Sequence, residues 1–284
     1  MSALPQVVGV VGGGRMGIGI AHAFLLAGAQ VTVLERDHEA ADHASAALLT
    51  AIETSVARGT TEEPREELVA RARTTINIDD LADSGLVVEA VPEDLPLKGQ
   101  MLARVEGVVG ADAWLASNTS SLSISLIAQA LARPERLCGL HFFNPVPSSK
   151  LVEIVRGVAS AAQLIDLAQQ WVVEIGKTPV TVNDSPGFAS SRLGVVIALE
   201  AIRMLEEGVA SAEDIDAAMV LGYKFPVGPL RLTDMVGLDV RLGIATYLHE
   251  TLGDRFEPPA LMREMVAAGR LGRKTGQGFF QWED

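Results

Sequence analysis

The chain has 284 residues, of which 48% are hydrophobic, 21% charged and 5% aromatic, so its composition is that of a globular protein and excludes the disordered and fibrous classes. A formal net charge of −13 repels nucleic acid and anionic lipid surfaces, and no uninterrupted run of 18 apolar residues predicts a membrane span. A single cysteine, Cys138, allows no intramolecular disulfide, and no charged leader precedes the first apolar run. We therefore expect a cytoplasmic protein without nucleic-acid or membrane partners.

The first half of the chain alternates between short apolar runs and helical patterns. The predicted strands are 6–11, 30–34, 74–78, 86–91 and 113–117, and the predicted helices between them are 15–28, 37–58, 95–109 and 123–132. Strands that are buried on both faces and separated by helices are typical of a parallel sheet with helices on each side. This pattern predicts an α/β fold.

The pattern changes after residue 136. Two apolar segments, 136–142 and 151–157, flank a stretch with two prolines that cannot be helical, which predicts a pair of neighbouring strands. A helix over 161–175 and a last strand over 178–183 follow. Asp184 and Ser185 before Pro186 predict a helix start, and 188–270 has only helical patterns. We therefore predict two domains, 1–184 with a mostly parallel sheet and 185–284 all-α.

Three glycines, Gly12, Gly14 and Gly17, form the pattern G-x-G-x-x-G between the first predicted strand and helix. They permit a tight turn, a close approach of a pyrophosphate to the backbone, and close packing of the helix on the strand. Glu35 follows the second strand, where a carboxylate accepts hydrogen bonds from a ribose diol. The pattern predicts a Rossmann-like NAD site that includes Gly12, Gly14, Arg15, Met16, Gly17 and Glu35. Arg36 leaves binding of a 2′-phosphate open.

Polar residues also follow the strand over 113–117, and segment 117–121 reads Ser-Asn-Thr-Ser-Ser at the edge where such sheets bind ligands. The alternative interpretation of this serine-rich stretch is capping of the next helix by Ser121 or by Ser123, two residues further on. His141 ends one apolar strand and Glu153 lies inside the next, where a buried carboxylate requires a partner. A His-Glu pair across two strands would orient an imidazole as a general base for an alcohol.

Two other chemistries are weighed against this interpretation. Ser120, His141 and Glu153 have the residue types of a hydrolase triad, but no nucleophile elbow surrounds Ser120. No His, Cys or Asp cluster has metal-ligand spacing, so we predict no metal site. Cys138 lies in an apolar strand and is expected to act as a small buried hydrophobe.

The chain resembles the L-3-hydroxyacyl-CoA dehydrogenase family, most closely its bacterial 3-hydroxybutyryl-CoA type. The resemblance covers residues 6–282 and is carried by the segments GVVGGGRMGIGIA, EAVPEDLPLK, SNTSSLSI, HFFNPVPSSKLVE, DSPGF and GRKTGQGFF. It implies NAD-dependent oxidation of a 3-hydroxyacyl-CoA, substrate binding between two domains, and a homodimer formed through the helical C-terminal domain.

The same resemblance implies roles for single residues. His141 would be the base, Glu153 its orienting partner, and Ser120 with Asn144 would lie beside the reacting oxygen. The cofactor contacts that it adds are Glu93, Lys98, Asn118 and Lys274. Ser55 and Arg58 are candidates for binding the nucleotide part of coenzyme A. Ser191 replaces the asparagine that the family has in its active site, so this contact is shortened or lost.

The hypothesis is therefore reversible NAD-dependent oxidation of a short-chain (S)-3-hydroxyacyl-CoA. A related dehydrogenase of a free hydroxy acid is one alternative, and a non-catalytic dinucleotide-binding protein of the same fold is another. The four polar residues Ser120, His141, Asn144 and Glu153 argue against the non-catalytic alternative, since binding of a dinucleotide alone would not require them.

Overall fold

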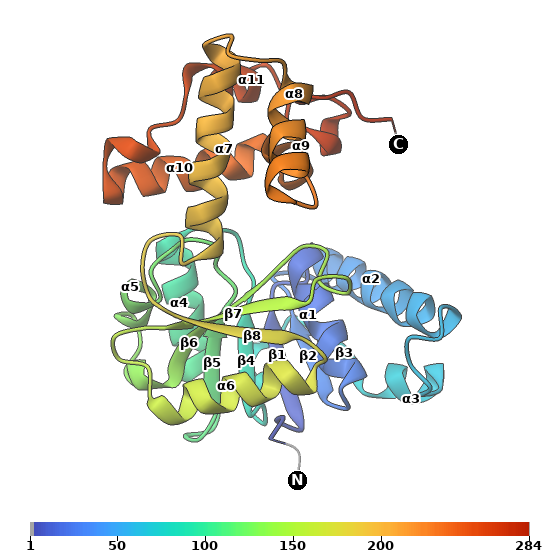
Figure 1. Cartoon of the computed structure of the whole chain (residues 1–284). Helices are drawn as coiled ribbons and strands as arrows, with labels where there is room; N and C mark the ends of the chain where they lie inside the picture. The colour runs from blue at the N-terminus through green and yellow to red at the C-terminus, as the bar shows by residue number, and fades with distance from the viewer. Residues whose placement is uncertain (1–2, 284) are drawn as a thin grey trace. The chain divides into compact units, whose positions relative to one another are not determined.

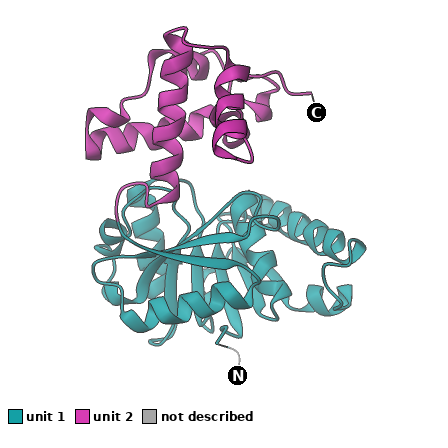
Figure 2. Cartoon of the chain, viewed as in Figure 1, with its two compact units in different colours: residues 1–184 teal, residues 185–284 magenta. Residues whose placement is uncertain are grey.

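A computed structural model describes residues 3–283. The chain divides into two compact units, residues 1–184 and residues 185–284, which Figure 2 shows in different colours. Among residues 3–283, no helix is both long and apolar enough to cross a membrane. Each unit is described by itself below.

The first unit is built on an eight-stranded sheet with the order β3-β2-β1-β4-β5-β6-β7-β8. Every neighbouring pair is parallel except β6 and β7, which are antiparallel. This mostly parallel sheet confirms the predicted fold class. The strands are β1 (Val7–Val11), β2 (Gln30–Leu34), β3 (Ala72–Thr75), β4 (Leu86–Glu89), β5 (Trp114–Ser117), β6 (Leu137–Phe142), β7 (Leu151–Arg156) and β8 (Thr178–Asn183).

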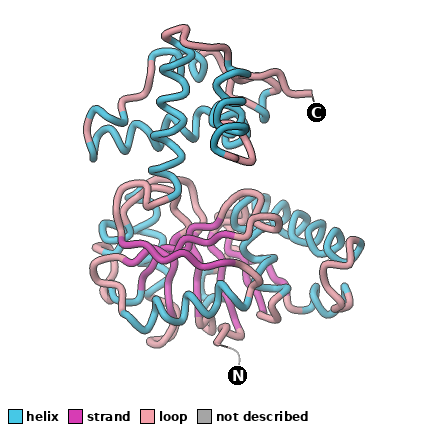
Figure 3. The backbone as a smooth tube through the Cα atoms, viewed as in Figure 1, coloured by secondary structure: helices cyan, strands magenta, loops and turns pink. Residues whose placement is uncertain are grey.

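Helices accompany the strands of this unit, and Figure 3 shows the strands lying among them. They are α1 (Arg15–Leu26), α2 (His38–Ala57), α3 (Arg65–Ala70), α4 (Leu95–Glu106), α5 (Ile124–Ala128) and α6 (Ala162–Glu174), with short 3-10 turns at Ile78–Leu81 and Pro134–Arg136. Asp37, Asp94 and Ser123 cap α2, α4 and α5 through their side-chain oxygens. Capping by Ser123 agrees with the alternative given above for that hydroxyl.

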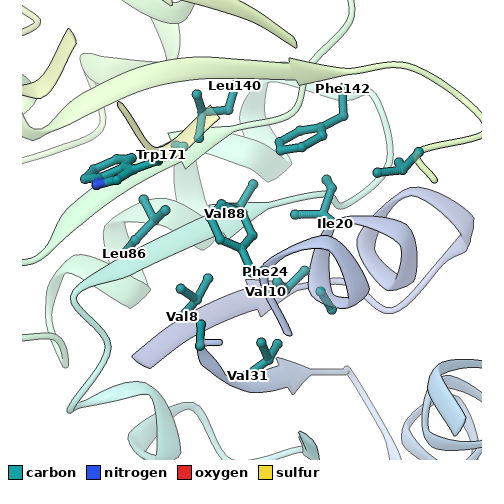
Figure 4. Packing of buried hydrophobic residues seen from close by; sticks show 14 of the residues in the cluster. Val8, Val10, Ile20, Phe24, Val31, Leu86, Val88, Leu140, Phe142 and Trp171 are labelled. Carbon is teal, nitrogen blue, oxygen red and sulfur yellow. The ribbon is translucent and has the colours of Figure 1, made fainter. Parts of the chain in front are cut away.

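The core of the first unit lies between the central strands and the helices α1 and α6. Phe24 of α1 and Phe142 of β6 meet edge to face, with 6.4 Å between ring centroids, and Trp171 of α6 is 1% exposed (Figure 4). Strands β1 and β4 contribute side chains that are 0% exposed, such as Val10 and Val88. Full burial of the central strands explains why they read as continuous apolar runs in the sequence.

The second unit consists of helices, labelled in Figure 1, around its own apolar core. They are α7 (Ser190–Glu206), α8 (Ala212–Ala217), a π-helical turn (Ala218–Gly222), α9 (Pro229–Val236), α10 (Leu238–Leu252), α11 (Ala260–Ala267) and 3-10 turns at Asp254–Phe256 and Arg273–Thr275. Asp234 of α9 is 0% exposed and accepts hydrogen bonds from the backbone of Phe279 and Phe280. This carboxylate fixes the C-terminal segment to the unit.

The predicted helix start at Asp184 and Ser185 is wrong. Helix α7 begins at Ser190, because Gly187 and Phe188 have φ values of 72° and 52°, in the left-handed region that interrupts a right-handed helix. The Asp184 carboxylate instead accepts hydrogen bonds from the Ser123 hydroxyl and from Ser125 N.

Candidate active site

A tight turn joins β1 to α1. Gly12 has a φ of 94°, which a glycine adopts without strain. A Cβ built on Gly17 would lie 1.8 Å from the carbonyl oxygen of Gly12, so α1 packs too closely on the turn for any side chain there. No atom lies within 4 Å of a Cβ built on Gly14. Gly12 and Gly17 therefore determine the shape of the turn, and Gly14 leaves the surface of the turn open to a ligand.

The N-terminus of α1 offers backbone amides to an anion. Gly14 is the N-cap residue, and no side chain accepts a hydrogen bond from the first turn. Arg15 is exposed and Met16 is half-buried in this turn. Such a helix start, with free N–H groups and the positive end of the helix dipole, fits a pyrophosphate.

Glu35 follows β2 and lies against the glycine turn. Its Oε1 accepts a hydrogen bond from Gly13 N at 2.5 Å, and its Oε2 accepts one from Arg36 N at 3.1 Å. The Arg36 side chain bonds instead to Asp37, with Nε 2.9 Å from Oδ2, and this contact raises the pKa of Arg36. The carboxylate of Glu35, and not the guanidinium of Arg36, therefore faces the glycine turn. A carboxylate at this position fits a ribose diol.

The segment after β5 is fixed by Glu93. Its Oε1 accepts hydrogen bonds from Thr119 Oγ1 at 2.7 Å and from Ser120 N at 2.8 Å. Asn118 is 9% exposed, and its Oδ1 accepts a hydrogen bond from Phe142 N at 2.9 Å. These bonds hold Ser120 at the carboxyl end of the sheet, close to the end of β6.

A buried ion pair lies beneath this segment. Lys98 of α4 is 1% exposed, and its Nζ is 2.8 Å from Glu89 Oε1, 3.0 Å from Val91 O and 3.4 Å from Glu93 Oε2. Glu89 also accepts a hydrogen bond from Ser117 Oγ at 2.5 Å. Burial raises the pKa of Glu89, and the Lys98 charge opposes that shift.

Glu89 is a polar residue of the site that our sequence analysis missed, whereas its partner Ser117 belongs to the polar segment 117–121 named there. Glu89 ends the apolar run of β4, and the argument that a buried carboxylate requires a partner, used for Glu153, applies to it equally. Lys98 joins Glu89 to Glu93 and so links the end of β4 to the segment after β5.

His141 and Glu153 are direct neighbours on the antiparallel strands β6 and β7. Nδ1 of His141 is 2.9 Å from Oε2 of Glu153, and the two residues are 5% and 1% exposed. The ring of Phe143 lies 4.4 Å from the imidazole, centroid to centroid. The predicted contact between His141 and Glu153 is confirmed. With Nδ1 held by the carboxylate, Nε2 is the nitrogen through which the ring can accept a proton.

The remaining predicted residues of the first unit are placed differently. Asn144 is exposed in the segment between β6 and β7. Ser55 is 8% exposed and its hydroxyl is 3.0 Å from Nε2 of His22, a contact that our sequence analysis missed. Arg58 is exposed at the end of α2. Ser55 therefore belongs to the interior, whereas Arg58 is accessible to a ligand.

Two predicted residues belong to the second unit. Ser191 lies in the first turn of α7 and is half-buried. Lys274 lies in the turn Arg273–Thr275, with Nζ 2.6 Å from both carboxylate oxygens of Asp239. Among residues 3–283, no group of three or more His, Cys, Asp or Glu side chains is placed to hold a metal ion.

The geometry agrees with comparisons to known proteins. A family model described as 3-hydroxyacyl-CoA dehydrogenase, NAD binding domain, matches residues 7–185, and one described as the C-terminal domain of the same enzyme matches residues 187–282. The chain belongs to the 3-hydroxyacyl-CoA dehydrogenase family. The predicted family and the predicted NAD cofactor are thereby confirmed.

Relatives and solved structures agree with this assignment over the full length of the chain. A 3-hydroxybutyryl-CoA dehydrogenase of Mycobacterium tuberculosis is 42% identical over 289 aligned positions, covering 99% of this chain and 100% of the relative. The crystal structure of M. tuberculosis FadB2 has a TM-score of 0.93 at 41% identity, covering 98% of this chain and 99% of that one. (S)-3-hydroxybutyryl-CoA dehydrogenase PaaH1 from Ralstonia eutropha has a TM-score of 0.92 at 39% identity, covering 99% and 100%.

Proposed function

We propose that the protein catalyses the reversible NAD-dependent oxidation of a short-chain (S)-3-hydroxyacyl-CoA to the 3-oxoacyl-CoA. The observation that carries this proposal is the buried pair of His141 and Glu153, with 2.9 Å between Nδ1 and Oε2. The pair lies at the end of a sheet whose first turn is built for a dinucleotide. An alcohol next to a nicotinamide needs a base of this kind.

His141 takes the proton of the 3-hydroxyl through Nε2 as the C3–H bond breaks. The NAD held by these residues would supply the acceptor for the hydride of C3. Glu153 stabilises the imidazolium that forms, because its carboxylate already accepts the hydrogen bond of Nδ1. Ser120 and Asn144 hold the reacting oxygen, and the bonds from Glu93 fix the backbone of Ser120.

The residues that hold NAD form two groups in the first unit. The amides of the glycine turn, with Arg15 and Met16, take the pyrophosphate, and Glu35 takes a ribose diol. Glu93, Lys98 and Asn118 form the second group. Lys98 Nζ is 3.4 Å from Glu93 Oε2, and Asn118 directly follows β5, with its Oδ1 accepting a hydrogen bond from Phe142 N. Lys274 of the second unit is the remaining candidate.

In this proposal, the second unit contributes a contact to the substrate and forms the dimer interface. Ser191, in the first turn of α7, is the substrate contact, and Arg58 of the first unit is the candidate for the phosphates of coenzyme A. Exposed apolar residues on α7, α9 and α10 favour a homodimer through this unit: Leu193 at 61%, Met235 at 45%, Val236 at 41% and Val240 at 44% exposed. A cytoplasmic location stays a prediction.

The proposal is tested by following NADH consumption with acetoacetyl-CoA and with acetoacetate. Rapid consumption of NADH with the thioester alone supports the proposal. Consumption with acetoacetate alone would favour the dehydrogenase of a free hydroxy acid. Binding of NADH without turnover of any 3-oxoacyl-CoA would favour a non-catalytic protein.

A further inference from the structure

Three charged side chains form a group at the carboxyl end of β4. Lys98 contacts two carboxylates, with its Nζ 2.8 Å from Glu89 Oε1 and 3.4 Å from Glu93 Oε2. Neither carboxylate has a second basic partner among residues 3–283. This group, the Glu–Lys–Glu triad, therefore combines two acidic side chains with a single basic one.

Glu89, the last residue of β4, is held in its ionised form. It is 0% exposed, and all three of its hydrogen-bond partners are donors: Lys98 Nζ and Val91 N to Oε1, and Ser117 Oγ to Oε2. Ser117 Oγ accepts a hydrogen bond from Thr119 N at 3.3 Å and gives its own proton to the carboxylate. Burial raises the pKa of Glu89, and the Lys98 charge and the three donors oppose that shift. With Glu89 ionised, the triad has a net charge of one negative unit.

The negative charge of the triad exceeds what its own structure requires. Lys98 needs one counter-charge, and Glu93 can provide it. An amide in place of the Glu89 carboxylate could accept the bonds from Lys98 and Val91 N through its oxygen and donate to Ser117 Oγ. A buried carboxylate that is not fully compensated costs free energy. Its presence indicates that a positive group from another molecule comes close to it.

Glu89 lies between the glycine turn and the pair of His141 and Glu153. The strands β1, β4, β5 and β6 are neighbours in this order (Figure 1). Glu89 is in register with Val11, directly before the glycine turn, and with Ser117 of β5. In the proposed function, a dinucleotide with its pyrophosphate at the glycine turn must bring its nicotinamide to His141 of β6. The nicotinamide half therefore crosses the carboxyl ends of β4 and β5, where the triad lies.

We propose that Glu89 makes the site discriminate between the two redox forms of the cofactor, because the excess negative charge of the triad stabilises the positive nicotinamide ring of NAD⁺ and not the neutral ring of NADH. The inference rests on the proposed function. The two forms share the adenine, both riboses and the pyrophosphate, so contacts to these parts cannot distinguish them. A charge near the nicotinamide can.

The expected size of the effect follows from the sheet. Neighbouring strands are about 4.8 Å apart, so a ring above β5 or β6 lies within about 10 Å of Glu89. At an effective dielectric constant of about 20, two unit charges at about 10 Å change an equilibrium constant roughly tenfold. Removal of the Glu89 charge should therefore weaken NAD⁺ binding about tenfold and leave NADH binding unchanged.

The test measures the dissociation constants of NAD⁺, NADH and ADP-ribose by calorimetry for the wild type and Glu89→Gln. ADP-ribose has no nicotinamide, so its affinity reports on the glycine turn and Glu35. We expect the dissociation constant of NAD⁺ to rise at least fivefold, and those of NADH and ADP-ribose to stay within twofold. Glu66→Gln, at an exposed carboxylate of α3, should change none of the three. An equal loss of affinity for all three ligands, or an unchanged affinity for NAD⁺, would overturn the inference.

A second variant decides the question if Glu89→Gln does not fold. Glu93 belongs to the same triad, and its side chain is 39% exposed, so its substitution removes a charge that is not deeply buried. Contacts that Glu93 makes with both redox forms cancel in the ratio of the two dissociation constants. For Glu93→Gln, the ratio of the NAD⁺ constant to the NADH constant should rise at least threefold. A ratio equal to that of the wild type would overturn the inference.

The inference and the proposed function fail in different ways. Wild-type oxidation of NADH by acetoacetyl-CoA, combined with a ratio of dissociation constants that does not depend on the triad, rejects the inference alone. Absence of binding of both NAD⁺ and NADH to the wild type rejects the proposed function as well.

Discussion

Replacing Glu153 by Gln tests the proton-transfer pair directly. The substitution keeps the shape of the side chain and removes a charge that is 1% exposed and 2.9 Å from Nδ1 of His141. The charge of an imidazolium, averaged over its ring, lies about 4 Å from the carboxylate, and at an effective dielectric constant of about 20 this pair is worth about 4 kcal/mol. Since about 1.4 kcal/mol corresponds to a factor of ten in rate, Glu153→Gln should lower kcat by about 10²–10³.

The assay is the initial rate of NADH oxidation with saturating acetoacetyl-CoA, combined with fluorescence titration of NADH binding. We expect the dissociation constant of NADH to stay within twofold, because Glu153 does not belong to the glycine turn. Glu135→Gln is the matched control, since Glu135 is an exposed carboxylate paired with Arg133. A Glu153→Gln enzyme that keeps kcat within threefold of the wild type would refute the assignment of His141 and Glu153.

Three further predictions concern the first unit. Lys98→Met leaves Glu89 buried without its counter-charge, so the free energy of unfolding should fall by about 3–5 kcal/mol in urea titrations, and a loss below 1 kcal/mol would contradict the buried ion pair. Gly14→Ala should keep the wild-type melting temperature but weaken NADH binding at least 10-fold, whereas Gly17→Ala should lower the melting temperature because its Cβ has no space; equal effects of the two variants would contradict the roles assigned to these glycines. Burial raises the pKa of Cys138 to about 12 from 9.0, so its contribution to stability is complete below pH 9 and is lost as the pH rises toward 12. From pH 7 to pH 10 the wild type should lose about 1.4 kcal/mol more than Cys138→Ala in urea titrations, and parallel pH profiles would argue against a fully buried thiol.

Elements with a strong local signal were predictable from the sequence. Strands β2 and β8 have the predicted bounds, 30–34 and 178–183, because β-branched runs end at clear turn residues. The contact of His141 with Glu153 was predictable for a different reason. A carboxylate in an apolar strand requires a partner, and the neighbouring apolar strand offers one.

Features that depend on contacts between distant residues were not predictable in the same way. The start of α7 was misplaced because the backbone of Gly187 and Phe188 is left-handed, and a capping pattern at Asp184 does not show this. Helix α3 was missed because its six residues are too few for a periodic pattern. Ser55 was expected to reach a ligand, yet its hydroxyl meets a histidine 33 residues away.

The antiparallel pairing of β6 and β7 supports both members of the His141–Glu153 pair through the backbone. The ladder between the strands sets the separation of imidazole and carboxylate, so neither group depends on a loop for its position. A slip of one residue in this ladder would turn one of the two side chains to the opposite face of the sheet and break the contact between imidazole and carboxylate. Loops around the pair are therefore free to diverge for new substrates while the acid–base step stays constant.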